Sequence, residues 1–180
     1  LLLLLPVLCS AIELDSLYDQ VFKKRIKTVQ LYPQYGNIQN EILPAIFKLN
    51  QSSPLELHFD DVTEDSYNYA IKIVHCNQDW KSSILVATDY LNEYNEFLVN
   101  DLEQSFNTQV LYTHYTFSIP KITKSGNYGI IMYDLDTEEL ILCKRFIIFS
   151  EDVKVKIQSN YSDLRSDKGL QTFNFTIDFE

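Results

Sequence analysis

Short runs in which apolar and polar residues alternate are the feature of this chain that most constrains its fold. The runs are rich in aromatic and β-branched residues, which suit the pleated surface of a sheet. They cover residues 26–32, 43–49, 55–59, 67–76, 110–119, 126–133 and 139–149. A parallel α/β fold would show regular helical patterns between the strands, and no such pattern separates these runs. The sequence therefore predicts an all-β, Ig-like antiparallel β-sandwich over residues 26–150.

One long segment interrupts this alternation. Residues 77–108 contain the single tryptophan, Trp80, and dispersed apolar residues without a sustained period. We predict a long inserted loop with some helix here, and long loops in compact domains are often functional. Its larger apolar residues either fold back over the core or face a partner, and the pattern leaves both open. These residues are Tyr90, Leu91, Phe97 and Phe106.

The N-terminal residues have the pattern of an export sequence. Residues 1–8 form an apolar run that is too short to span a bilayer, and Cys9-Ser10-Ala11 follows as a stretch of small residues. This pattern is typical of the hydrophobic region and cleavage site of a secretory signal peptide. We interpret residues 1–11 as a signal-peptide remnant that is cleaved after Ala11. The mature protein is then expected to be periplasmic, without direct insertion into a membrane.

Residues 12–25 form a lead-in between this remnant and the first strand. Their apolar residues are spaced either like a short helical turn or like a flexible connection. They are Leu14, Leu17, Val21 and Phe22.

The last residues alternate again. The runs at 153–157 and 173–179 have strand periodicity, but a segment of this length is too short to bury a core of its own. Residues 151–180 are therefore predicted to be the truncated start of a second β domain.

Charge and composition exclude several classes of function. The net charge is −10, and no basic cluster is longer than Lys23-Lys24-Arg25, so a nucleic-acid partner is not expected. Only 4 glycines are present, which is too few for a glycine-rich phosphate loop. No sequence pattern of a known nucleophile or metal protease occurs. We therefore predict that the chain is not an enzyme and that it uses no cofactor.

Candidate metal ligands are sparse. His75 and Cys76 are adjacent, so on a strand they point to opposite faces and do not readily share an ion. The acidic residues after run 55–59 lack the order of an EF-hand loop, and we interpret them as a solvated turn. They are Asp60, Asp61, Glu64 and Asp65. In an exported protein, Cys76 and Cys143 could form a disulfide or remain two separate thiols.

The alternation also assigns residues to faces. Glu56 and His58 share the face of their run that is opposite to its apolar residues. His114 shares a face with Tyr112 and Thr116, which predicts a histidine on the sheet surface or half-buried.

Several short motifs follow one another in a fixed order. They are Ile26-Lys27-Thr28-Val29-Gln30-Leu31-Tyr32-Pro33, His75-Cys76-Asn77-Gln78-Asp79-Trp80, Asp89-Tyr90-Leu91, Ser105-Phe106-Asn107-Thr108, Tyr112-Thr113-His114-Tyr115, Ser125-Gly126-Asn127-Tyr128 and Lys144-Arg145-Phe146. In this order and spacing they resemble the first domain of the type IX secretion system plug protein of Bacteroidetes. The resemblance covers about residues 26–150.

The resemblance implies a periplasmic β-sandwich that docks on the outer-membrane translocon barrel and keeps its resting channel closed. It brings no catalytic, cofactor-binding or metal-binding residues. Its motif residues are expected to serve the structure or to contact the partner. We expect Trp80 to pack across the sandwich, Asn77 and Asn107 to fix turns, and Gly126 to allow a tight turn before Tyr128.

The inserted segment 77–108 is the expected contact region, and Glu93, Glu96 and Glu103 are its acidic candidates for that contact. Without the resemblance, an exported carbohydrate-binding module or an accessory Ig-like module fits the same residues.

Overall fold

The structure is a computed structural model that describes residues 16–34, 44–50, 55–161 and 171–179. The predicted signal-peptide remnant, residues 1–11, lies outside the described residues. The chain divides into two compact units, Leu1–Phe149 and Ser150–Glu180, and each is described here by itself.

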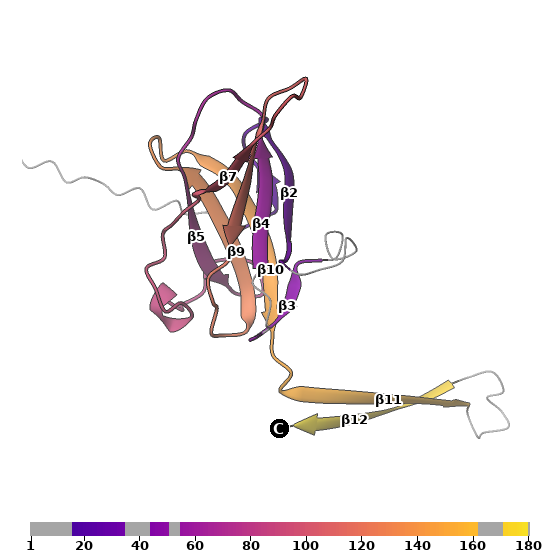
Figure 1. The fold of residues 1–180 in the computed structure, drawn as a ribbon. Helices are drawn as coiled ribbons and strands as arrows, with labels where there is room; N and C mark the ends of the chain where they lie inside the picture. Colours follow the sequence, from indigo (N-terminus) through magenta and orange to yellow (C-terminus); the bar gives the residue numbers. More distant parts are fainter. Residues whose placement is uncertain (1–15, 35–43, 51–54, 162–170, 180) are drawn as a thin grey trace, which may run out of the picture. The chain divides into compact units, whose positions relative to one another are not determined.

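Two sheets pack face to face in the first unit (Figure 1). The six-stranded sheet has the order β1-β10-β9-β5-β6, and β3 also pairs with β10. Its strands are β1 (Gln20–Val21), β3 (Ile46–Lys48), β5 (Tyr69–Cys76), β6 (Phe97–Leu98), β9 (Gly126–Asp134) and β10 (Leu140–Phe149). The four-stranded sheet has the order β2-β4-β8-β7. Its strands are β2 (Ile26–Pro33), β4 (Leu55–Asp61), β7 (Asp101–Gln104) and β8 (Thr113–Ser118). The predicted all-β sandwich is confirmed, and all its strand pairs are antiparallel except β3 with β10.

The core lies between the two sheets and is formed mainly by residues of β2, β4, β5, β8, β9 and β10. Leu57 and Phe59 of β4 are fully buried, as the alternation predicted. The Phe59 ring stacks on Tyr115 of β8 with 4.9 Å between ring centroids. Tyr69 of β5 meets both rings edge-on from the other sheet, at 5.7 Å and 5.3 Å. Aromatic pairs in these geometries add stability beyond the area that they bury, by about 0.5–1.5 kcal/mol each.

Two predictions about loops are wrong. Residues 20–21 of the lead-in form neither a helical turn nor a flexible connection, because they pair as β1 with β10. The acidic turn does not begin at Asp60 and Asp61, because both belong to β4. Asp61 is fully buried, and it accepts a 2.5 Å hydrogen bond from the Tyr69 hydroxyl and pairs with Arg25 at 3.0 Å. A buried charge needs such partners, which the local sequence did not indicate.

The inserted segment contributes to both sheets. It holds a 3₁₀ turn at Ala87–Asp89, which is its only helical part, and the short strands β6 and β7. β6 pairs with β5 in the six-stranded sheet, and β7 pairs with β8 in the four-stranded sheet. The segment therefore crosses from one sheet to the other instead of forming one structureless loop.

The second unit is a single antiparallel hairpin. Its strands are β11 (Val153–Tyr161) and β12 (Gln171–Phe179), and the register runs without interruption from Val153 opposite Phe179 to Tyr161 opposite Gln171. Both strands extend beyond the predicted runs. The second β domain itself stays a prediction.

No helix in the described part of the chain is long and apolar enough to cross a membrane. Cys76 and Cys143 are both free and buried, which favours two separate thiols over a disulfide. Burial raises the pKa of each thiol to about 11.

Candidate functional site

Several motif residues meet at one end of β5 and β9. The His75 ring contacts the rings of Tyr128 and Tyr90, with centroids 5.0 Å and 5.9 Å away, and its Nδ1 lies 2.7 Å from the Ser83 hydroxyl. Gly126 has a φ of +155°, and a Cβ atom there would lie 2.3 Å from His75 Nε2. Glycine is required because any side chain would displace the histidine. Burial lowers the pKa of His75, which favours the neutral form of the ring.

The next motif forms a tight turn after β5. The Asn77 side-chain oxygen accepts hydrogen bonds from the backbone N–H groups of Asp79 and Lys81, at 2.9 Å and 3.1 Å. Asn127 donates a 3.1 Å hydrogen bond to the Asn77 carbonyl and so ties the turn to β9. Trp80 ends the turn with a φ of +60°.

Trp80 does not pack across the sandwich, which corrects the expectation from the sequence. It is half-buried on the outer face of the six-stranded sheet, beside a small cluster formed by Leu17, Cys76, Ile131 and Cys143. The Arg145 guanidinium lies over the Trp80 ring at 4.5 Å and over the Tyr18 ring at 4.8 Å. Cys76 faces this cluster while His75 faces Tyr128, so the two side chains do point to opposite faces.

Residues 16–19 of the lead-in lie across this outer face. Leu17 donates a 2.9 Å backbone hydrogen bond to the Trp80 carbonyl. A Cβ atom on Gly129 would lie 2.2 Å from the Leu17 side chain, so the glycine provides the room that Leu17 occupies. Asp19 accepts 2.7 Å hydrogen bonds from the Arg145 backbone N–H and the Lys144 ammonium.

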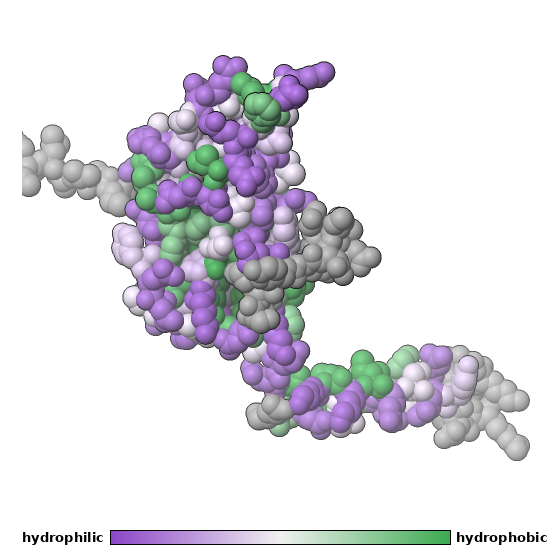
Figure 2. Space-filling model, in the orientation of Figure 1, coloured by the Kyte–Doolittle hydropathy of each residue, from purple (hydrophilic) through white to green (hydrophobic). Residues whose placement is uncertain are grey.

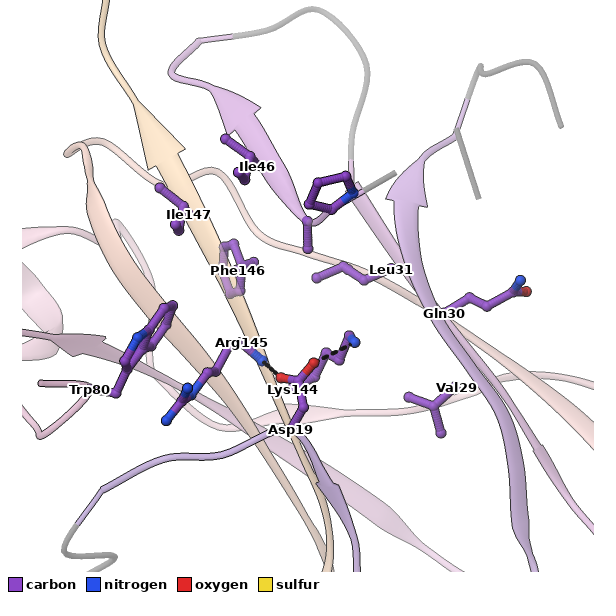
Figure 3. A pocket seen from close by; sticks show the side chains of 12 residues that line it. Asp19, Val29, Gln30, Leu31, Ile46, Trp80, Lys144, Arg145, Phe146 and Ile147 are labelled. Atoms are coloured by element: carbon purple, nitrogen blue, oxygen red, sulfur yellow. Dashed lines mark hydrogen bonds and ion pairs between the residues drawn. The ribbon is translucent and has the colours of Figure 1, made fainter. Parts of the chain in front are cut away.

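A pocket of about 340 Å³ opens beside these residues, between β10 and β2 (Figure 3). It lies along the part of β10 between its pairing with β1 and its pairing with β3. Apolar side chains form much of its lining, and Lys144, Arg145 and Asp19 supply its charges. The lining residues are Asp19, Val29, Gln30, Leu31, Pro44, Ala45, Ile46, Trp80, Lys144, Arg145, Phe146 and Ile147. The apolar lining is suited to an apolar side chain of a partner. The charges of Asp19 and Lys144 neutralise each other in part, because the two side chains form an ion pair.

The outer face of the four-stranded sheet carries a second polar group. His114 Nδ1 lies 2.7 Å from Asp60, and its Nε2 lies 3.3 Å from His58 Nδ1. His58 Nε2 lies 3.4 Å from Glu56, and its ring stacks on Tyr32 at a centroid distance of 4.6 Å. The sequence placed Glu56 and His58 on one face but missed this cluster, because the register of β4 against β8 brings Asp60 opposite His114.

The first half of the inserted segment is tied to β5. Tyr90 is buried, and its hydroxyl donates a 2.9 Å hydrogen bond to the Ile73 carbonyl. Asn95 accepts from the Ile73 N–H at 2.9 Å and donates to its carbonyl at 2.7 Å. Leu91 is buried and pairs with Ile122. These contacts fold Tyr90 and Leu91 back onto the sandwich.

The second half of the segment leads into a hairpin with β8. Ser105 closes this hairpin, because its N–H donates to the Tyr112 carbonyl and its hydroxyl accepts from the Tyr112 N–H, both at 2.9 Å. The Thr108 hydroxyl donates a 2.8 Å bond to the Val110 carbonyl, and Asn107 has a φ of +56°, a conformation that asparagine adopts more readily than most residues. Four apolar side chains of this hairpin remain exposed. They are Leu102, Phe106, Val110 and Leu111.

Figure 1 shows this hairpin at the end of the sandwich away from the 3₁₀ turn, reaching past the end of β4. Figure 2 shows apolar residues gathered near its tip with polar ones around them. We name residues 101–112 the exposed hairpin.

Among the described residues, no group of three or more His, Cys, Asp or Glu side chains could hold a metal ion. Many of the motif residues fall into two separate groups, one around His75 and Asn77 and one in the exposed hairpin, whereas the motifs Ile26–Pro33 and Lys144-Arg145-Phe146 lie on β2 and β10. Tyr115 belongs to neither group, since it stacks in the core, and His114 points to the outer face of its sheet.

Comparison with known proteins identifies relatives of this chain. A solved structure described as a hypothetical protein from Parabacteroides merdae superposes with a TM-score of 0.74 at 26% sequence identity. The match covers 92% of this chain and 42% of that chain, so this chain spans less than half the length of its relative. A search of curated proteins found no match. The sequence model of the family described as "Type 9 secretion system plug protein 1st domain" matches residues 26–150, which include most of the sandwich. This chain therefore belongs to the family of the first domain of type 9 secretion system plug proteins.

Proposed function

We propose that this protein is a non-catalytic periplasmic subunit that binds the outer-membrane translocon of the type IX secretion system and keeps its channel closed. The observation that carries this proposal is the family match over residues 26–150, whose description is that of a plug protein. A plug has to be a rigid body with a contact surface, and it needs no nucleophile, metal or cofactor.

The packing of the sandwich supports a rigid body. Its core joins both sheets in one cluster, and the lead-in is pinned to the outer face through Leu17 and Asp19. Well-packed cores have low compressibility. The plug can then occlude an opening by its shape, and its release requires a change at its contact surface.

The exposed hairpin is the part of the inserted segment that best suits this contact. Phe106 is 94% exposed, yet the hairpin that carries it is held by the hydrogen bonds between Ser105 and Tyr112. An aromatic side chain on a preordered backbone loses less conformational entropy on binding than one on a flexible loop, and aromatic residues are often anchors of interfaces. Asp101 and Glu103 are exposed on the same hairpin. These features fit a translocon surface with an apolar recess and a basic rim.

The three glutamates of the inserted segment that were expected to contact the partner do not have equal roles. Glu93 and Glu103 are exposed, whereas Glu96 accepts a 2.7 Å hydrogen bond from Tyr133 and pairs with Lys72 at 3.0 Å. Reversing the charge of Glu96 would therefore disturb the sandwich itself. A test of the interface should change Glu93 and Glu103 and leave Glu96 intact.

The experiment is a gene deletion in the native host, complemented by tagged variants of the full-length protein. Loss of the protein should make the outer membrane permeable to a large dye, and the wild-type copy should restore the barrier and co-purify the translocon. Unchanged permeability together with no co-purification would refute the plug proposal, and binding to a glycan array would then favour the carbohydrate-binding alternative.

The contact region is tested in the same strain. Phe106→Ala, and separately the pair Glu93→Lys with Glu103→Lys, should weaken co-purification, by about tenfold or more if Phe106 is an anchor. Glu64→Lys with Glu138→Lys changes the net charge equally at exposed positions outside the segment and should bind normally. If Phe106→Ala and the Glu93 and Glu103 pair also bind normally while the deletion strain leaks, the plug proposal stands and the contact region lies outside the inserted segment.

A further inference from the structure

The hairpin of β11 and β12 separates most of its residues by polarity. Residues that face each other in its register share one side of the sheet, and Val155–Ile177 and Ile157–Phe175 are such pairs. The apolar side comprises Val153, Val155, Ile157, Tyr161, Phe173, Phe175, Ile177 and Phe179, with Ser159 and Gln171 as its polar members. The other side is polar throughout. Its residues are Lys154, Lys156, Gln158, Asn160, Thr172, Asn174, Thr176 and Asp178.

All eight apolar side chains are exposed, from 46% for Val153 to 79% for Tyr161. Figure 2 shows the apolar residues of this unit along one side and the polar residues along the other. On the polar side, Lys156 and Asp178 form a 3.1 Å ion pair that suits a surface in water. A row of aromatic and branched side chains of this length is larger than the apolar patches that soluble monomers usually leave uncovered. An isolated two-stranded hairpin is also only marginally stable in water.

We propose that this apolar side is one half of the core of a second β-sandwich, and that its other half is a sheet formed by polypeptide that follows residue 180 in the full-length protein. β11 and β12 are then the first two strands of that domain. The proposal concerns the architecture of the full-length protein, and it does not depend on the plug function.

Two findings favour this occupant. The family match ends at residue 150, where the hairpin unit begins, and its description names a first domain. The matched solved chain is more than twice as long as its matched part. The match covers 92% of this chain, and the hairpin unit Ser150–Glu180 is a larger share of the chain than the part left unmatched. Part of the hairpin unit therefore has a counterpart in that longer chain.

The hairpin geometry also favours a sheet from the same polypeptide over a second copy. Residues on one side of paired strands form a flat surface, which packs well against another sheet about 10 Å away. β11 and β12 pair only with each other in the described part of the chain, so the outer edge of each strand carries N–H and C=O groups that can pair with a further strand. Two copies placed face to face would cover the apolar sides but would leave these edges open. A continuous chain can supply both the facing sheet and the neighbouring strands, at a high effective concentration.

Site-specific photo-cross-linking in the full-length protein tests the proposal. A photoreactive benzoylphenylalanine replaces Phe175 on the apolar side, and in a matched variant it replaces the neighbouring Thr176 on the polar side. After irradiation, mass spectrometry should find cross-links from position 175 to residues beyond 180 of the same chain. Position 176 should form no cross-links to those residues. Links from position 175 to a second copy or to another protein would overturn the proposal.

Hydrogen exchange of the unmodified full-length protein provides a test that needs no variant. Amides of residues 153–161 and 171–179 should exchange at least about tenfold more slowly than unprotected amides, because they lie in a folded domain. Phe175→Asp should remove this protection from the hairpin and from peptides beyond residue 180, while Thr176→Asp should retain it. Fast exchange of the hairpin in the unmodified protein would also overturn the proposal.

Discussion

Tyr90 and Phe106 belong to the same inserted segment, yet they end in opposite environments. Tyr90 is 3% exposed and lies beside His75 and Tyr128, whereas Phe106 is 94% exposed near the tip of the exposed hairpin. Figure 1 places the two parts of the segment at opposite ends of the sandwich. Neither residue belongs to an alternating run, so periodicity did not distinguish them.

The difference follows from the partners that each side chain finds. The Tyr90 hydroxyl donates to the Ile73 carbonyl, so its burial leaves no polar atom unsatisfied. The exposed hairpin is held by the hydrogen bonds between Ser105 and Tyr112, but it reaches beyond the sheet that could cover Phe106. An apolar residue of an insertion is therefore structural when it can return to the core, and it is a candidate contact when its backbone is ordered but its side chain is not covered.

Truncating the two residues should give the largest contrast. We expect Tyr90→Ala to lower the free energy of unfolding by about 3–5 kcal/mol, because it removes a buried ring and its hydrogen bond. Phe106→Ala should change it by no more than about 0.5 kcal/mol, as is usual at exposed positions. Urea unfolding followed by circular dichroism measures both. Similar losses for the two variants would contradict the comparison.

Asn95 tests how the first half of the inserted segment is held on β5. Its side chain satisfies both backbone groups of Ile73, so Asn95→Ala should cost about 1–3 kcal/mol through unsatisfied groups next to the core. Asn92→Ala is the matched control, because Asn92 is exposed in the same segment. Equal unfolding midpoints for the two variants would show that Asn95 does not hold the segment.

Trp80 lies near the start of the inserted segment and should show an intermediate effect. Its ring is half-buried and carries the Arg145 guanidinium, so Trp80→Ala should cost about 1–2 kcal/mol, less than the truncation of Tyr90. Trp80→Phe keeps an aromatic face for Arg145 and should recover part of the loss. A loss as large as that of Tyr90→Ala would restore the original expectation of a tryptophan in the sandwich core.

The smallest effect concerns the pH dependence at His75 of β5, whose ring contacts Tyr90 of the inserted segment. Burial lowers the pKa of His75 from 6.5, so the unfolded chain binds a proton more readily than the folded protein as the pH falls below that value. His75 therefore destabilises the fold progressively as the pH drops below about 6.5. Urea midpoints at pH 7.5 and 5.5 should shift less in His75→Gln than in the unmodified protein. An equal shift would mean that other groups account for the pH dependence.

The sequence predicted most of the fold because alternation is a local property. It located every long strand of the sandwich, placed Leu57 and Phe59 in the core, and put Glu56 and His58 on the opposite face. It did not predict β1, β6 or β7, because strands of two to four residues are too short to show a period. It also mistook Asp60 and Asp61 for a turn, because their partners His114 and Arg25 are distant in the sequence.

By itself the sequence determined the fold class, the family, and which residues of the run 55–59 face the core. It did so because an alternation of side chains along an extended backbone can be read one strand at a time. Only the tertiary structure decided that Trp80 lies outside the core against Arg145, that Tyr90 is buried, and that Phe106 is exposed. These outcomes depend on the pairing register and on contacts between distant segments, which fix each side chain after the strands have assembled.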